Sequence, residues 1–129
     1  MLREILVITG KPGLYRLITR GKNIIIVESL TDNKRMPVHL HDKIVSLDDI
    51  YFFTNKSKES VGEIFLKIQE KEKGKFVSID YSKASPDELR AYLEEVLPDF
   101  DRERVYTDDI IKLLKWHDLL INNGIPFFN

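Results

Sequence analysis

The chain has 129 residues with 43% hydrophobic and 32% charged side chains, which suits one domain or two small units sharing a core and argues against global disorder. Its formal net charge of −1 excludes a strong overall attraction to nucleic acid or membranes, and the absence of cysteine excludes disulfides, thiolate zinc sites and thiol nucleophiles. No apolar run approaches the length of a signal-peptide core or a membrane span, so we expect a cytoplasmic protein without membrane attachment.

The charge is distributed unevenly along the chain. Residues 1–58 contain ten basic and six acidic side chains, a balance of +4, whereas residues 59–129 contain ten and fifteen, a balance of −5. Halves of opposite sign attract each other where they pack together, and a basic face can instead bind a polyanion. Both interpretations remain open from the sequence alone.

The first half has the pattern of short strands joined by tight turns. Lys11-Pro12-Gly13 matches a type II turn, because proline fixes φ at the first corner and glycine accepts a positive φ at the next. Pro37 cannot donate a ladder hydrogen bond, so its strand is expected at a sheet edge. The predicted strands cover Ile5–Thr9, Leu14–Arg20, Asn23–Leu30, Lys34–Leu40, Ile44–Leu47 and Ile50–Phe53.

The second half changes to helical periodicity. Apolar residues there recur at spacings of three and four, which predicts three amphipathic helices that pack on each other and on the strands. The start and end signals are Ser60 and Gly74, Ser85-Pro86 and Pro98, and Thr107 and Asn123-Gly124. One further strand is predicted at Phe76–Ile79, and Thr54–Glu59 is the segment nearest to a linker.

These patterns predict an α+β protein with two parts. Residues 1–56 are expected to form a small β-barrel of the SH3-like kind, because short, closely spaced strands in so small a unit favour a compact barrel. Residues 57–129 are expected to form a C-terminal helical domain. An open meander of strands packed on the helices is the competing topology for the first part.

Several stretches resemble an uncharacterised bacterial family, defined as a domain of unknown function with a paired C-terminal domain of unknown function. The similarity runs over nearly the full length, and it implies no activity and no catalytic residues, because the family has no assigned biochemistry. The resembling stretches are Gly10–Tyr15, Ile26–Asp32, Arg35–Pro37, Asp42–Leu47, Lys83–Ser85 and Val96–Arg102.

The candidate catalytic and metal sites are weak. His39 and His41 alternate on a strand and can supply two metal ligands, but zinc requires at least a third. Gly10–Gly13 lacks the spacing of a phosphate-binding loop, and a turn between strands explains it more simply. No serine lies in a nucleophile-elbow motif. We therefore expect no enzyme activity, no metal and no cofactor, and we interpret His117 as a residue at the edge of the core.

The basic residues of the first half are the stronger candidates for recognition. Gathered on one rim of a barrel, they would surround an aromatic anchor such as Tyr15 or Tyr51. We expect a non-catalytic binding or adaptor protein with a protein partner, and RNA or single-stranded nucleic acid is the alternative partner. A homodimer is also considered, because Trp116, Ile125, Phe127 and Phe128 exceed what a small core hides. The candidate binding residues are Lys11, Tyr15, Arg16, Arg20, Lys22, Lys34 and Arg35.

Overall fold

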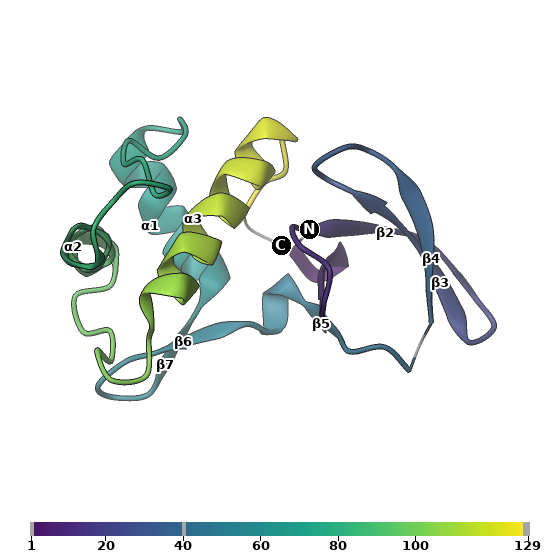
Figure 1. Cartoon of the computed structure of the whole chain (residues 1–129), viewed down its shortest axis with the longest axis horizontal. Coiled ribbons are helices and arrows are strands. Elements are labelled where there is room, and N and C mark those ends of the chain that lie inside the picture. The colour runs from purple at the N-terminus through teal and green to yellow at the C-terminus, as the bar shows by residue number, and fades with distance from the viewer. Residues whose placement is uncertain (1, 40, 128–129) are drawn as a thin grey trace.

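The computed structural model describes residues 2–39 and 41–127 and shows a curled sheet beside three helices (Figure 1). The predicted α+β class is therefore confirmed. The strands are β1 (Ile5–Ile8), β2 (Tyr15–Gly21), β3 (Ile24–Ser29), β4 (Arg35–His39), β5 (Ile44–Ser46), β6 (Tyr51–Phe53) and β7 (Lys58–Ser60). The helices are α1 (Val61–Glu72), α2 (Pro86–Val96) and α3 (Thr107–Asn122), and two 3-10 turns are η1 (Leu2–Glu4) and η2 (Leu47–Asp49).

The first five strands form an open antiparallel sheet, so the predicted SH3-like barrel is wrong. Their order is β4-β3-β2-β1-β5, and the described residues of β4 and β5 do not pair with each other. The barrel does not close because the sixth predicted strand leaves the sheet. After η2 the chain enters β6, which pairs with β7 in a separate two-stranded sheet. Pro37 lies in an edge strand, as predicted from its missing amide hydrogen.

The open sheet is nevertheless strongly curled. Strands β4 and β5 lie at opposite edges, yet His39 at the end of β4 and Ile44 at the start of β5 are only five peptide units apart, so these two residues lie within ~17 Å of each other. A register shift between Leu17 and Thr19 marks a bulge in β2, which increases the local twist. The inner face of the curl has its own small apolar core of Leu6, Ile8, Tyr15, Ile25, Val27 and Val38.

The β6–β7 hairpin belongs to the helical part of the molecule. Thr54, which follows β6, forms a β-bridge with Phe100 in the connection between α2 and α3. Thr54–Glu59, interpreted above as nearest to a linker, instead forms the hairpin turn and part of β7. Phe76–Ile79 is irregular chain and not the predicted strand, because the Val77 N–H donates to the Asp118 carboxylate on α3 at 3.0 Å.

The three helices begin close to the predicted positions. Ser60 and Ser85 are N-caps as predicted, and each hydroxyl oxygen accepts the N–H of the residue three positions later. For the third helix, Tyr106 is the N-cap and Thr107 is the first helical residue. The Asp109 carboxylate accepts the Tyr106 N–H at 2.9 Å, so the acidic side chain and not the threonine completes this cap.

Helix α3 lies between the curled sheet and the other two helices (Figure 1). Its inner stripe packs into the main core, which also takes residues from α1, α2, η2 and the end of the sheet. Phe65, Phe100 and Leu113 are each 0% exposed, and complete burial of such side chains contributes about 1.5–3 kcal/mol each. No helix within the described residues is both long and apolar enough to cross a membrane.

Candidate binding groove

A groove with a volume of about 1140 Å³ lies between the sheet and the helical part. One wall is formed by the end of β1 and the turn at residues 9–13, and the opposite wall is formed by α3. Strand β6, the connection at Arg104 and Val105, and side chains from the α1–α2 connection complete the lining. The volume exceeds the range of about 300–1,000 Å³ typical of small-molecule pockets, so the groove is large enough for a polymer segment.

The α3 wall of the groove comes from a second stripe beside the one that enters the core. Asp109, Lys112, Trp116 and Leu119 recur at spacings of three and four, which places them on one face of the helix. Trp116 is the single tryptophan of the chain and is partly buried in this wall. Its indole fluorescence is therefore a natural reporter of groove occupancy.

Aromatic side chains are concentrated at the groove. Five large apolar residues are conspicuously exposed among the described residues, and Tyr51, Phe53 and Phe76, at 46%, 45% and 52%, all line the groove. The Lys58 ammonium lies 4.5 Å from the centre of the Tyr51 ring, and the Arg104 guanidinium lies 4.2 Å from the centre of the Phe53 ring. These cation–π contacts hold both rings in place on β6.

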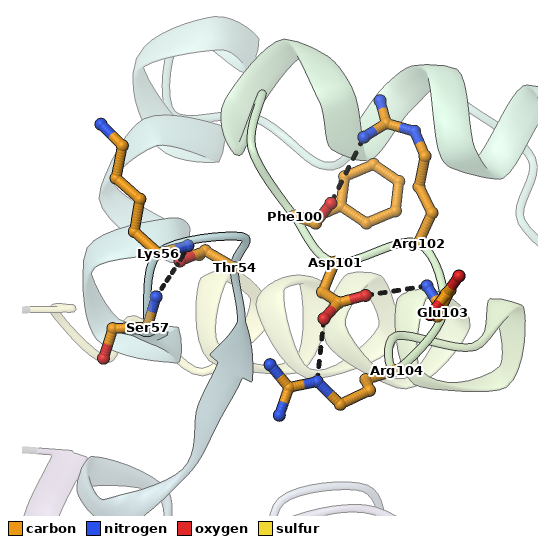
Figure 2. Close-up of polar contacts among 8 residues, drawn as sticks. All are labelled: Thr54, Lys56, Ser57, Phe100, Asp101, Arg102, Glu103 and Arg104. Carbon is orange, nitrogen blue, oxygen red and sulfur yellow. Dashed lines mark hydrogen bonds and ion pairs between the residues drawn. The ribbon is translucent and has the colours of Figure 1, made fainter.

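Arg104 is positioned by the turn after Phe100, shown in Figure 2. The Asp101 carboxylate accepts the Arg104 Nε–H at 2.8 Å and the Glu103 N–H at 2.9 Å. The hydrogen bond from Arg104, together with that from Glu103, lowers the pKa of Asp101. Asp101 thus stays ionised and keeps the guanidinium over Phe53.

The hairpin turn beside it is fixed by Thr54. Its hydroxyl oxygen accepts the N–H of Ser57 at 3.0 Å and that of Lys56 at 3.3 Å (Figure 2). Thr54 is 6% exposed, so these bonds form in a sheltered position and fix the turn that joins β6 to β7. The rings of Tyr51 and Phe53 in the groove therefore lie on an ordered element.

The charges of the lining are asymmetric. Lys11, Lys112 and Lys115 are exposed, and within residues 2–39 and 41–127 none of them forms an ion pair. The carboxylates of Asp109 and Asp118 each accept a main-chain N–H, at 2.9 and 3.0 Å. The lysines are therefore the groups free to bind an oppositely charged ligand.

A phenol adds one polar donor to this surface. Partial burial raises the pKa of Tyr81, and the negative charges of Asp118 and Asp80 raise it further. The phenol therefore keeps its proton at neutral pH and can donate a hydrogen bond into the groove. The groove therefore offers aromatic faces, ammonium groups and a phenol hydroxyl to a bound ligand.

The structure does not gather the predicted binding residues on one rim. Arg16 and Arg35 flank Glu28 across neighbouring strands, and the Arg35 Nε lies 3.1 Å from the Glu28 carboxylate. Arg20 pairs with Ile25, so the register places it on the inner face of the curl, opposite to the other two arginines.

The remaining predicted residues are also separated. Lys22 lies in the β2–β3 turn, at the far end of β3 from Lys34 in the β3–β4 turn. Lys11 alone among the seven lines the groove. Tyr15 is 7% exposed, and its hydroxyl donates to the Pro12 carbonyl oxygen at 3.0 Å, so its ring is part of the inner core and is not available for stacking.

Two of the three histidines lie at the surface, and the third lies in the core. The rings of His39 and His41 stack with centroids 5.3 Å apart, and His41 Nε2 lies 3.8 Å from the Asp42 carboxylate. Within the described residues, no group of three or more His, Asp or Glu side chains is arranged to hold a metal ion. His117 is 0% exposed and contacts the Phe127 ring, so it lies inside the core and not at its edge.

The C-terminal aromatic residues bear on the homodimer hypothesis only in part. Phe127 is 3% exposed and packs against Phe65, with ring centroids 5.4 Å apart. Trp116 and Ile125 are partly buried, and Phe128 lies outside the described residues. Much of this apolar surface is thus covered within one chain.

Two family models match the chain. A domain of unknown function (DUF5606) matches residues 2–47, and a domain of unknown function (DUF6852) matches residues 50–120. A solution NMR structure from Bacteroides vulgatus is similar, with 50% sequence identity, a TM-score of 0.76, and coverage of 96% of this chain and 88% of that one. No curated protein matches the chain. The predicted resemblance to a bacterial family with paired domains is confirmed.

Proposed function

We propose, on the premise that this chain belongs to the family defined by the domain of unknown function DUF6852 and its N-terminal companion DUF5606, that it is a non-catalytic protein that binds a segment of a partner protein. The binding surface is the groove between the sheet and α3, in place of the barrel rim expected from the sequence. The observation that carries this proposal is the clustering of the exposed rings of Tyr51, Phe53 and Phe76 in that one concave place.

Apolar surface of this kind supports a protein ligand. Aromatic side chains in a concave patch are typical of the anchoring sites where protein interfaces concentrate their binding energy. The turn that bears Arg104 and the hairpin that bears Tyr51 and Phe53 are both held by internal hydrogen bonds, so little ordering is required when a ligand binds.

The charge pattern favours protein over single-stranded RNA. Stacking rings beside lysines would suit RNA, but a nucleic-acid backbone needs basic groups along its whole bound length, and the groove offers three lysines without an ion pair among the described residues. The guanidinium of Arg104 is already bound by Asp101. The basic residues of the sheet, such as Arg16 and Arg20, lie on opposite faces and do not form one continuous track for a phosphate backbone.

A peptide selection tests this function. The full chain is immobilised and used to select from a phage-displayed library of random peptides about twelve residues long, and selected peptides are titrated while Trp116 fluorescence is followed. Phe76→Ser should weaken binding by about tenfold, since it removes an exposed aromatic contact. The matched control is Tyr106→Ser, because Tyr106 is 67% exposed and does not line the groove.

A second titration discriminates the partner class. Fluorescein-labelled random single-stranded RNA of about fifteen nucleotides is titrated at two salt concentrations, because RNA affinity falls steeply as salt rises. Selected peptides whose affinity depends on Phe76 and not on Tyr106 support the proposal. RNA binding that depends on Phe76, without selected peptides, would replace the protein partner with RNA. Failure of both probes would overturn the binding function itself.

A further inference from the structure

Strand β6 has one paired edge and one largely open edge. The Val61 N–H donates to the Ile50 carbonyl at 3.0 Å and the Thr54 N–H donates to the Ser57 carbonyl at 3.0 Å, so residues 50, 52 and 54 direct their main-chain groups toward β7. Phe52 therefore exchanges hydrogen bonds with Glu59. By the alternation of an antiparallel ladder, Tyr51 and Phe53 direct their amide and carbonyl groups away from β7.

Only part of this outer edge is occupied. The Phe53 carbonyl accepts the Asp101 N–H at 2.9 Å, and the chain then turns away, because the Asp101 carbonyl accepts the N–H groups of Arg104 and Val105. Among the described residues, no hydrogen-bond partner meets the outward N–H and carbonyl of Tyr51 or the N–H of Phe53. These three groups lie on a strand that lines the groove.

The side chains around this edge match an added strand. Tyr51 and Phe53 point to one face of β6, whereas Phe52 between them is 7% exposed and enters the core. A neighbouring strand would place alternate side chains beside the two exposed rings, where aromatic cross-strand pairs are favourable. A peptide backbone offers alternating N–H donors and carbonyl acceptors at the spacing of a strand, and a sugar–phosphate backbone does not.

We propose that the partner segment binds by strand addition to the open edge of β6, as an extended peptide with apolar residues facing Tyr51 and Phe53 and acidic residues facing the groove lysines. The acidic character follows from charge complementarity, since Lys11, Lys112 and Lys115 line the groove without an ion pair among the described residues. This inference rests on the proposed function, because it specifies how the groove holds a peptide. Strand addition to an exposed sheet edge is an established mode of peptide recognition.

Amide hydrogen exchange of the full chain tests the open edge directly. In the free protein the Phe52 amide should exchange slowly, because it is bonded to β7, whereas the Tyr51 and Phe53 amides should exchange at least about tenfold faster. A peptide from the selection above should slow exchange at Tyr51 and Phe53 and leave Phe52 unchanged. Slow exchange of Tyr51 in the free protein would overturn the inference whatever the peptide result.

Two further measurements separate this inference from the proposed function. N-methylation of a selected peptide should weaken binding by about tenfold at alternate positions only, because every second peptide amide would face β6. Lys112→Glu with Lys115→Glu should weaken binding by a similar factor, whereas the matched control Lys43→Glu, outside the groove, should not. Peptides that bind through Phe76 but tolerate all N-methylations would leave the groove function standing and reject strand addition. Selected peptides without acidic residues would reject the acidic character of the partner.

Discussion

The side-chain amide nitrogen of Asn123 lies 3.1 Å from the main-chain carbonyl oxygen of Leu30, 93 residues earlier in the chain. The same nitrogen donates to the Leu119 carbonyl at 2.8 Å, so one side chain caps the end of α3 and ties that helix to the end of β3. The Leu30 N–H donates to the Leu14 carbonyl at 2.9 Å, which extends the contact to the β1–β2 connection. One amide thus fixes how the two walls of the groove meet.

Replacing Asn123 with alanine should destabilise the protein by about 1–2 kcal/mol, because the partly buried Leu30 carbonyl oxygen loses the side-chain donor and the Leu119 carbonyl keeps only the main-chain N–H of residue 123. Asn123→Asp should cost more, since a carboxylate would face the same two oxygens without a hydrogen to donate. Urea unfolding measures both changes, and Asn122→Ala is the control, because Asn122 is exposed. Equal stability of the Asn122 and Asn123 variants would contradict this role.

Local sequence signals predicted where strands and helices form better than they predicted which strands pair with each other. Ser85 caps α2 and Pro37 marks an edge strand because the physical cause lies in the residue itself. The strand at Ile50–Phe53 was also predicted, but its pairing was not. That pairing depends on β7 and on Phe100, which lies about fifty residues later, and no nearby pattern encodes such a choice.

The groove could not be predicted from local sequence patterns for the same reason. Its lysines and rings come from the β1–β2 turn, β6, the α1–α2 connection and α3, which meet only in the folded chain. Tyr15 was wrongly predicted to be exposed. The alternation of Tyr15 and Arg16 shows that they point to opposite faces of the strand, but it does not show which face is buried. The one available signal was on α3, where Lys112 and Trp116 form a second stripe beside the apolar one.

Stability should fall as the solution is made mildly acidic, because of His117. Its imidazole is 0% exposed, and no described group bonds to its Nε2 atom. Burial lowers the pKa of His117 below 6.5, although the negative charges of Asp118 and Glu72 oppose this effect. As the pH falls below about 6.5, His117 is therefore protonated in the unfolded chain while it is still neutral in the folded chain. The free energy of unfolding then decreases by at most ~1.4 kcal/mol for each pH unit.

Urea unfolding at about pH 7.5 and about pH 5.5 measures this loss, since carboxylates titrate mainly below that window. His117→Phe should remove most of the pH dependence, because phenylalanine suits the site between Phe65 and Phe127. The matched control is His39→Gln with His41→Gln, which changes two exposed histidines and should keep the dependence. A wild-type protein equally stable at both pH values would show that His117 accepts its proton without cost.

The hydroxyl of Tyr92 should stabilise the contact between α1 and α2. It donates to the Glu72 carboxylate at 2.5 Å, and the same carboxylate accepts the N–H and hydroxyl of Ser78. Partial burial alone would raise the pKa of Glu72, but the hydrogen bonds from Tyr92 and Ser78 outweigh it and lower the pKa. Tyr92→Phe should therefore cost about 1.5–3 kcal/mol at neutral pH, the range for hydrogen bonds to charged groups.

The pH dependence identifies the cause. A carboxylate whose pKa is lowered by folding contributes stability above its unfolded pKa, here 4.5, and loses it as pH falls through the folded value. The difference between wild type and Tyr92→Phe should therefore shrink at about pH 3. Tyr106→Phe is the control, because that side chain is 67% exposed. A difference that stays constant with pH would assign the loss to packing instead.

The turn at the groove wall contains two glycines, Gly10 and Gly13, whose alanine variants should separate the effect of backbone strain from that of close packing. Gly10 and Gly13 have φ values of +84° and +82°, and residues with a Cβ atom rarely adopt this backbone conformation. Alanine at either position should therefore lower the free energy of unfolding by about 1–2 kcal/mol. A Cβ at Gly13 would also lie 3.2 Å from Thr31 Oγ1, whereas a Cβ at Gly10 would meet nothing within 4 Å. Gly13→Ala should therefore be the more destabilising of the two.

Urea unfolding of both variants in wild-type and Thr31→Ala backgrounds isolates the steric part. With the hydroxyl gone, Gly13→Ala should cost about the same as Gly10→Ala, because only the backbone strain remains at either position. Thr31 is exposed, so its own replacement should change stability by less than about 0.5 kcal/mol. If the two glycine variants differ by the same amount in both backgrounds, the contact with Thr31 does not restrict Gly13.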